Sequence, residues 1–147
     1  MSLNYAEIGP SFSFPIRVYW EDTDAGGVVY HASYVCFLER ARTEWLRSIG
    51  VSQYSLREQD DVVFAVRGMQ LEYLAPARLD DALTVHVRVA EMGRASLVFD
   101  QRIVRQSDGK LLLEAKVRVA CLSGGTFRPR ALPEWMRLQF LNLLNEV

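Results

Sequence analysis

The chain has 147 residues, of which 50% are hydrophobic and 24% are charged, and its formal net charge is −1. These values are typical of a soluble globular domain, so we expect residues 1–147 to form a single domain with its own core. The balanced charge provides no overall positive field for nucleic acid, and no apolar run is long enough to span a bilayer. The N-terminus lacks the basic and apolar regions of a secretory signal, which favours a cytoplasmic location.

Changes in the period of the hydrophobic pattern divide the chain into elements. Residues 1–11 are expected to form a loose tail. A period of two predicts strands at Ser11–Trp20, Val62–Leu74, Ala82–Met92, Ala95–Gln106 and Lys110–Leu122. Steps of three and four between His31 and Gly50 predict one helix of about 19 residues, roughly 28 Å long. We also expect a helical turn at Ser52–Glu58 and a terminal helix at Pro133–Asn145.

The long helix is predicted to bury one face. Its apolar positions are Tyr34, Phe37, Leu38, Ala41, Trp45, Leu46 and Ile49. Its charged positions are Glu39, Arg40, Arg42, Glu44 and Arg47, which we expect on the solvent side. A strand of about nine residues is roughly 30 Å long, so one antiparallel sheet can curl around this helix. The prediction is an α+β fold whose open sheet edges favour pairing with a second chain.

The segment "EDTDAGGVVYH" (Glu21–His31) precedes this helix and combines acids, adjacent glycines and a histidine. A helix start offers unpaired N–H groups, Gly26 and Gly27 permit a sharp turn, and Asp24 and His31 can act as base or nucleophile and as proton carrier. Capping and turn formation are the alternative explanation for such residues. The combination favours a site that hydrolyses a carbonyl compound.

The stretch "YWEDTDAGGVVYHASYVCFLERARTEWLR" resembles hotdog-fold acyl-CoA thioesterases of the 4-hydroxybenzoyl-CoA thioesterase superfamily, in particular the branch encoded with the bacterial Tol-Pal system. The stretches "RGMQLEYLAPARLDD", "SLVFDQRIV" and "RPRALP" share this resemblance, which covers about residues 14–135. It implies a hotdog fold, a dimer or dimer of dimers, and hydrolysis of a thioester of coenzyme A or acyl carrier protein.

The resemblance also implies roles for individual residues. The family's catalytic aspartate falls on Asp24, which attacks the carbonyl or activates a water. The motif histidine falls on His31 and implies an aliphatic acyl group, which we expect to be short. Backbone N–H groups around Tyr30 and His31 would polarise the carbonyl, and Asp22 is expected to be a cap.

Further substrate contacts are expected from Gly27, where the backbone can approach a ligand, and from Tyr30, which is equally suited to core packing. The phosphates of coenzyme A require cations, and Arg67, Arg94, Arg128 and Arg130 are the candidates. The terminal helix is expected to pack on the core or on another subunit rather than on a membrane.

Metal and cofactor chemistry finds no support in the sequence. Two histidines and two cysteines lie at no ligand spacing, so we expect neither a metal nor a cofactor, coenzyme A being part of the substrate. Cys36 and Cys121 lie in apolar stretches, which predicts two buried, reduced thiols.

Two other functions remain open at this stage. A hotdog hydratase or dehydratase also uses an acid and a histidine on acyl thioesters. A non-catalytic module that binds an acyl carrier or a cell-envelope protein is the other alternative.

Overall fold

The computed structural model describes residues 11–145, so the expected tail at 1–11 lies almost wholly outside the described residues. Its elements, in chain order, are β1 (Phe12–Arg17), a 3₁₀ turn (Trp20–Asp22), α1 (Ser33–Ser48), α2 (Gln53–Asp60), β2 (Val62–Tyr73), β3 (Ala82–Met92), β4 (Ser96–Arg105), β5 (Leu111–Ser123) and α3 (Glu134–Asn145). Each predicted element is present. The first strand is shorter than predicted because the chain turns at Trp20, and α1 begins at Ser33.

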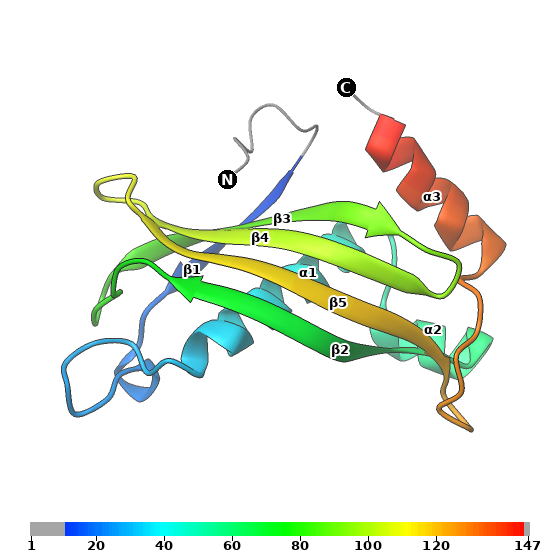
Figure 1. Ribbon diagram of the computed structural model, residues 1–147, viewed down its shortest axis with the longest axis horizontal. Helices are drawn as coiled ribbons and strands as arrows, with labels where there is room; N and C mark the ends of the chain where they lie inside the picture. The colour runs from blue at the N-terminus through cyan, green and yellow to red at the C-terminus, as the bar shows by residue number, and fades with distance from the viewer. Residues whose placement is uncertain (1–10, 146–147) are drawn as a thin grey trace.

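One antiparallel sheet holds the five strands in the order β1-β3-β4-β5-β2, and α1 runs across one of its faces (Figure 1). This arrangement confirms the predicted α+β fold of a sheet around one helix. Pro15 lies in β1, an edge strand, where its missing N–H costs no sheet hydrogen bond. A bulge interrupts the pairing of β2 with β5 between Val66 and Gly68.

The core forms between α1 and the inner face of the sheet. Its helix side is the predicted apolar set from Tyr34 to Leu46, and its sheet side includes alternate residues of β3 such as Leu83, Val85 and Val87, each fully buried. Period-two alternation in β3 therefore produces one face that packs on the helix and one that does not.

Two predictions about α1 are wrong. Arg42 is buried instead of solvent-facing, because its Nη1 donates to Gln101 Oε1 at 2.9 Å beneath the helix. Cys36 is exposed instead of buried, since it precedes the inward-facing Phe37 and one residue turns the helix by about 100°. Cys121 is buried, and both thiols are free.

The sheet has two edges, β1 and β2, and each pairs with a single strand within the described residues. None of the helices within residues 11–145 is long and apolar enough to cross a membrane.

Candidate active site

A tight hairpin precedes α1 and carries the predicted acid. Thr23 and Val29 form an antiparallel bridge, the N–H of Asp24 donates to Val28 O at 3.0 Å, and Gly27 N–H donates back to Asp24 O at 3.0 Å. Gly27 has φ +80°, a left-handed conformation that glycine adopts without strain. The tandem glycines therefore form a closed turn, and Asp24 stands at its first corner.

The Asp24 carboxylate is exposed but held in place. Its Oδ1 accepts a hydrogen bond from the N–H of Gly26 at 2.8 Å, an Asx turn within the hairpin. A Cβ on Gly26 would lie 3.1 Å from the same oxygen, so glycine also leaves room for this contact. The result is a carboxylate that faces solvent in a fixed orientation.

Asp22, two residues earlier, has a different environment. It is 8% exposed, its Oδ2 accepts from Tyr19 N–H at 2.8 Å, and its carbonyl accepts from Tyr30 N–H at 2.8 Å. The cap predicted for Asp22 is therefore present, but it closes the 3₁₀ turn and not α1. Burial and both bonds make Asp22 a structural acid, whereas Asp24 is accessible to a substrate.

The N–H of Tyr30 is not available to polarise a carbonyl, contrary to the prediction, because Asp22 O already accepts it. The neighbouring N–H of His31 has no backbone acceptor within residues 11–145. Ser33 N–H donates to Tyr30 O at 2.9 Å, which closes the turn into α1. Of the two backbone N–H groups predicted to bind the carbonyl oxygen, the N–H of His31 is therefore the remaining candidate.

His31 and Tyr30 are both exposed, and their ring centroids lie 4.5 Å apart. In the described part of the chain, no hydrogen bond or ion pair joins His31 to Asp24. The structure places both groups in the same exposed segment ahead of α1 without direct contact, so a substrate can approach both.

Tyr73 and Tyr34 position this segment, and sequence reasoning missed their roles. Tyr73 Oη donates to His31 O at 2.9 Å from the end of β2, and its ring packs edge-on against Tyr34 at 5.6 Å. Tyr34 Oη accepts from Ala77 N–H at 3.0 Å, and burial raises the pKa of this phenol. The sequence does offer one indication for Tyr73, because it lies at the end of the predicted strand Val62–Leu74 and on the face that the alternation directs toward the core.

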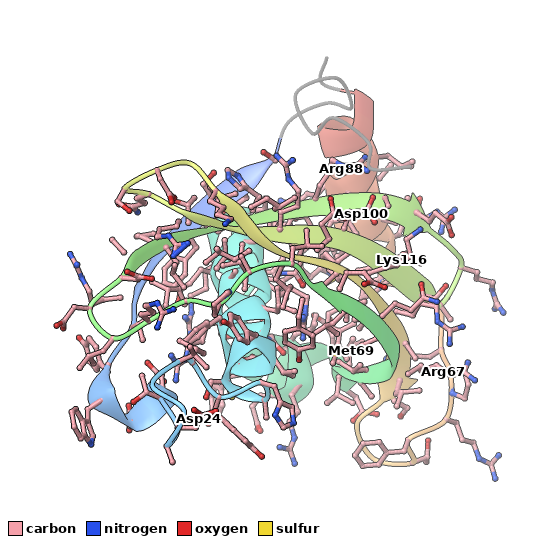
Figure 2. The ribbon with its side chains drawn as sticks, turned by 60° about the vertical axis from the view of Figure 1, so that its left-hand side comes forward. Asp24, Arg67, Met69, Arg88, Asp100 and Lys116 are labelled. Atoms are coloured by element: carbon pink, nitrogen blue, oxygen red, sulfur yellow. The ribbon has the colours of Figure 1, made fainter. Side chains whose placement is uncertain are left out.

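The candidate arginines do not reach the hairpin within one chain. Arg67 lies at the β2 bulge, across the view from Asp24 in Figure 2. Arg94 lies in the β3–β4 turn, at the end of β3 remote from the hairpin, since the Val29 N–H of the hairpin donates to Ala77 O in the loop before β3. Arg130 donates to Asp60 O at 2.7 Å and so connects the loop after β5 to the end of α2.

No group of three or more His, Cys, Asp or Glu side chains within the described residues is arranged to hold a metal ion. Three groups of the segment before α1 can take part in chemistry: the Asp24 carboxylate, the His31 imidazole and the backbone N–H of His31.

Comparisons with known proteins relate nearly the whole chain to one group of enzymes. Residues 18–140 match the model of the Thioesterase-like superfamily. The acyl-CoA thioester hydrolase YbgC of Escherichia coli O157:H7 is 54% identical over 129 residues, which cover 88% of this chain and 95% of that protein. The acyl-CoA thioesterase YbgC of Haemophilus influenzae is 46% identical over 132 residues, 90% of this chain and 96% of its own.

Solved structures agree with this. A probable thioesterase from Bartonella henselae has 35% identity and a TM-score of 0.80, covering 84% of this chain and 100% of its own. A Staphylococcus aureus protein in complex with CoA has a TM-score of 0.86 over 95% of this chain and 88% of its own, but at 21% identity this likeness shows the fold alone.

Proposed function

Because the chain belongs to the thioesterase-like superfamily, we propose that this thioester hydrolase acts on acyl-CoA, with Asp24 as the reacting carboxylate. The observation that carries the proposal is the exposed Asp24 carboxylate, fixed by Gly26 N–H in the hairpin before α1. The products are the free acid and coenzyme A. The cytoplasmic location that the sequence favours and the association with the Tol-Pal system that the resemblance implies belong to the same proposal.

Asp24 can serve in two ways. As nucleophile it attacks the thioester carbon, the C–S bond breaks, coenzyme A leaves as thiolate, and water then hydrolyses the acyl-aspartyl anhydride. As general base it removes a proton from a water that attacks the same carbon. In both routes negative charge develops on the carbonyl oxygen, and the His31 N–H and the positive end of the α1 dipole would stabilise it.

In the nucleophilic route, the neutral form of His31 is proposed to accept the proton of the water that hydrolyses the anhydride. Only a neutral imidazole can accept a proton, so turnover is expected to rise with pH as far as this group limits the rate. A His31→Ala variant is expected to lose most activity together with that limb of the pH–rate profile. An unchanged limb in His31→Ala would assign the titration to another group and leave His31 as a positioning residue.

The acyl group is proposed to be aliphatic. A short chain is proposed to be sufficient for turnover, because the groups proposed to act on the carbonyl lie together between Asp24 and the start of α1. Acyl carrier protein is the alternative thioester carrier. Gly27 and Tyr30 are proposed to border the substrate, and Arg67 and Arg94 are proposed to hold the phosphates.

A homo-oligomer of two or four chains is part of the proposal. The unpaired edge of β2 supports a dimer, and the exposed Trp135, Leu138 and Leu141 of α3 support further association. Two β2 edges related by a two-fold axis pair antiparallel, which would bring the β2 start of one copy, and the nearby Arg128, beside the hairpin of the other. Light scattering at micromolar concentration tests this, and a monomer would contradict it.

The decisive experiment compares two acids of the same segment, Asp22 and Asp24. Asp24→Asn removes the carboxylate charge with almost no change in volume and is expected to lower kcat by about 10²–10⁴-fold. Asp22→Asn keeps an oxygen that can accept from Tyr19 N–H, so it is expected to retain more activity. Free thiol released from butyryl-CoA is the readout, and it also separates hydrolysis from hydration.

The reverse result for these two variants would contradict the proposal. An inactive Asp22→Asn beside an active Asp24→Asn would reject the assignment of Asp24. Absence of thiol release from the unmodified protein, across coenzyme A and carrier-protein thioesters, would reject hydrolysis and favour the binding module.

A further inference from the structure

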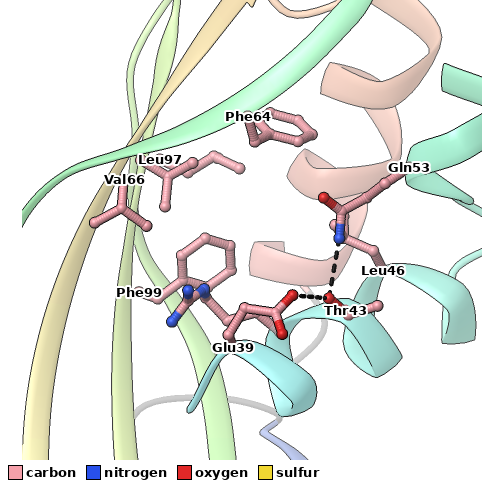
Figure 3. A pocket seen from close by; sticks show the side chains of 10 residues that line it. Glu39, Thr43, Leu46, Gln53, Phe64, Val66, Leu97 and Phe99 are labelled. Atoms are coloured by element: carbon pink, nitrogen blue, oxygen red, sulfur yellow. Dashed lines mark hydrogen bonds between the residues drawn. The ribbon is translucent and has the colours of Figure 1, made fainter. Parts of the chain in front are cut away.

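A short chain of side-chain hydrogen bonds joins the middle of α1 to α2. Gln53 Nε2 donates to Thr43 Oγ1 at 3.0 Å, and Thr43 Oγ1 donates to Glu39 Oε1 at 2.7 Å, as the dashed lines in Figure 3 show. These residues line a cavity of about 130 Å³ between α1 and the sheet. Thr43 lies ten residues after Ser33, roughly 15 Å along the helix, so these bonds cannot orient the hairpin directly.

The loop between β2 and β3, residues 74–81, contacts both the start of α1 and the hairpin through one residue. Ala77 is fully buried, its N–H donates to Tyr34 Oη at 3.0 Å, and its carbonyl accepts the N–H of Val29 at 2.9 Å. Val29 also forms the antiparallel bridge with Thr23 that closes the hairpin. The position of Ala77 therefore sets the position of the hairpin ahead of α1.

The peptide group before Ala77 is engaged at both ends. Its carbonyl, Pro76 O, accepts a hydrogen bond from Arg105 Nη1 at 3.4 Å, and its N–H is the one that donates to Tyr34. Because hydrogen bonds at the two ends of one peptide group polarise one another, the guanidinium makes the Ala77 N–H a stronger donor. Burial raises the pKa of the Tyr34 phenol, and the Arg105 charge lies close enough to oppose a small part of that rise.

The peptide group after Ala77 is held in the same manner. Its N–H, that of Arg78, donates to Asp81 Oδ2 at 2.9 Å, and its carbonyl is the acceptor for Val29. The same Asp81 oxygen lies 3.6 Å from Arg105 Nη1, in an ion pair of two largely buried side chains. Arg105 therefore contacts one of these peptide groups directly and the other through Asp81.

Arg105 is itself fixed from the opposite side. Its Nε donates to Asp108 Oδ1 at 3.3 Å, in the turn between β4 and β5, and its backbone N–H donates to Lys110 O at 2.9 Å. The guanidinium thus has acceptors both in this turn and in the loop 74–81. Its position follows the end of the sheet, so the sheet can hold the loop in place.

We infer that Arg105, at the end of β4, is a positioning residue for the proposed reaction. Its guanidinium joins Pro76 O and Asp81, these two fix the peptide groups of Ala77, and Ala77 O fixes the hairpin that carries Asp24. This role rests on the proposed function and adds to it a residue that acts through the backbone instead of on the substrate.

Kinetics of two Arg105 variants test this role. Arg105→Met keeps an unbranched apolar stem and removes both contacts with the loop. Because a displaced Asp24 impairs the chemical step more than binding, kcat for butyryl-CoA is expected to fall about tenfold while KM changes less than about twofold. Arg105→Lys keeps a positive charge that can reach Asp81 or Pro76 O but not both, and is expected to recover part of kcat.

Arg88→Met is the matched control, because Arg88 also forms a largely buried ion pair within the same sheet. Its Nη2 lies 2.6 Å from Asp100 Oδ2. Arg88 lies six residues after Ala82 on β3, about 20 Å along the strand, and Figure 2 shows the pair far from Asp24. Arg88→Met is expected to lower the melting temperature, as Arg105→Met does, but to keep kcat within about twofold.

Deuterium exchange of the Val29 amide reports the position of the hairpin without turnover. Its N–H is protected by Ala77 O, so loosening of the loop speeds its exchange through local opening. The exchange rate is expected to rise at least tenfold in Arg105→Met and to stay within about twofold in Arg88→Met. Mass spectrometry of fragments that span Val29 measures both.

The two measurements separate this role from the proposed hydrolysis. An unchanged kcat or an unchanged exchange rate in Arg105→Met overturns the inference, and so does an equal loss of kcat in Arg88→Met. Faster exchange of Val29 together with a lower kcat, in Arg105→Met alone, supports it. Should the exchange pattern appear while the unmodified protein releases no thiol from acyl-CoA, Arg105 still positions the hairpin and the proposed hydrolysis fails.

Discussion

Arg42 and Gln101 form a buried polar pair whose disruption should be costly. Arg42 is 8% exposed and Gln101 is 1% exposed, and the pair joins α1 to β4. The Gln101 amide also donates to Leu38 O at 3.0 Å. Burial lowers the pKa of Arg42, and the nearby Glu39 carboxylate raises it by less. The surroundings therefore compensate the buried charge of Arg42 only in part. The substitution Gln101→Leu keeps the volume and removes both bonds.

The cost can be worked out from these contacts. A hydrogen bond to a charged group contributes about 1.5–3 kcal/mol, and a buried charge that loses its partner costs more than the bond alone. We expect Gln101→Leu to lower the free energy of unfolding by about 3 kcal/mol. For a chain of this size, that corresponds to a fall in melting temperature of roughly 6–12 °C.

A double-mutant cycle in urea tests this reasoning. Arg42→Met alone should also destabilise, because it leaves the Gln101 amide buried without its donor. The double variant should cost less than the sum of the two, since apolar groups then replace both partners. Additive costs, or a Gln101→Leu variant within about 0.5 kcal/mol of the unmodified protein, would refute the claim that the pair acts as a unit.

Three further predictions concern titration, thiol reactivity and the hairpin. His86 contacts Ser13 Oγ at 3.1 Å, and burial lowers the pKa of its imidazole below the ordinary value of 6.5. The unfolded chain therefore takes up this proton at a higher pH than the folded one, and the free energy of unfolding falls as the pH drops below about 6.5. His86→Gln should flatten the fall in melting temperature between pH 7 and pH 5. Cys36 is exposed and burial raises the pKa of Cys121, so a thiol reagent should modify Cys36 first and Cys121 only on unfolding, as mass spectrometry of the labelled peptides can show. Gly27→Ala places a side chain at φ +80° and should cost about 1–2 kcal/mol, measured by urea unfolding, together with a fall in kcat.

The α+β arrangement of one sheet around one helix could be predicted because its elements carry strong local signals. The alternation in β3 gave Ala82–Met92, the same bounds that the structure has, since period two fits only a strand with one buried face. The helix could be predicted for the same reason, but the burial of each of its side chains could not. Arg42 looks like a surface residue from its spacing, and only the partner 59 residues away, Gln101, explains its burial.

The hairpin marks the limit of what local sequence can specify about the site. Its composition alone predicts a turn with exposed acids but does not distinguish the buried Asp22 from the exposed Asp24. That choice depends on the 3₁₀ turn, because Asp22 closes it through Tyr19 N–H while Asp24 remains outside. Asp22 O in the same turn also accepts the N–H of Tyr30, a donor that the sequence predicts for the carbonyl oxygen of the substrate.

The orientation of this segment depends on contacts remote in sequence. Tyr73, 42 residues from His31, holds the carbonyl at the entrance to α1, and Tyr34 links the same region to Ala77. Tyr73→Phe removes the hydroxyl that donates to His31 O but keeps the ring that packs edge-on against Tyr34. The proposed orientation of His31 should then be lost while the core packing remains. Turnover of butyryl-CoA is therefore expected to fall in Tyr73→Phe with little change in melting temperature, and an unchanged turnover would mean that this bond does not position the segment that reacts.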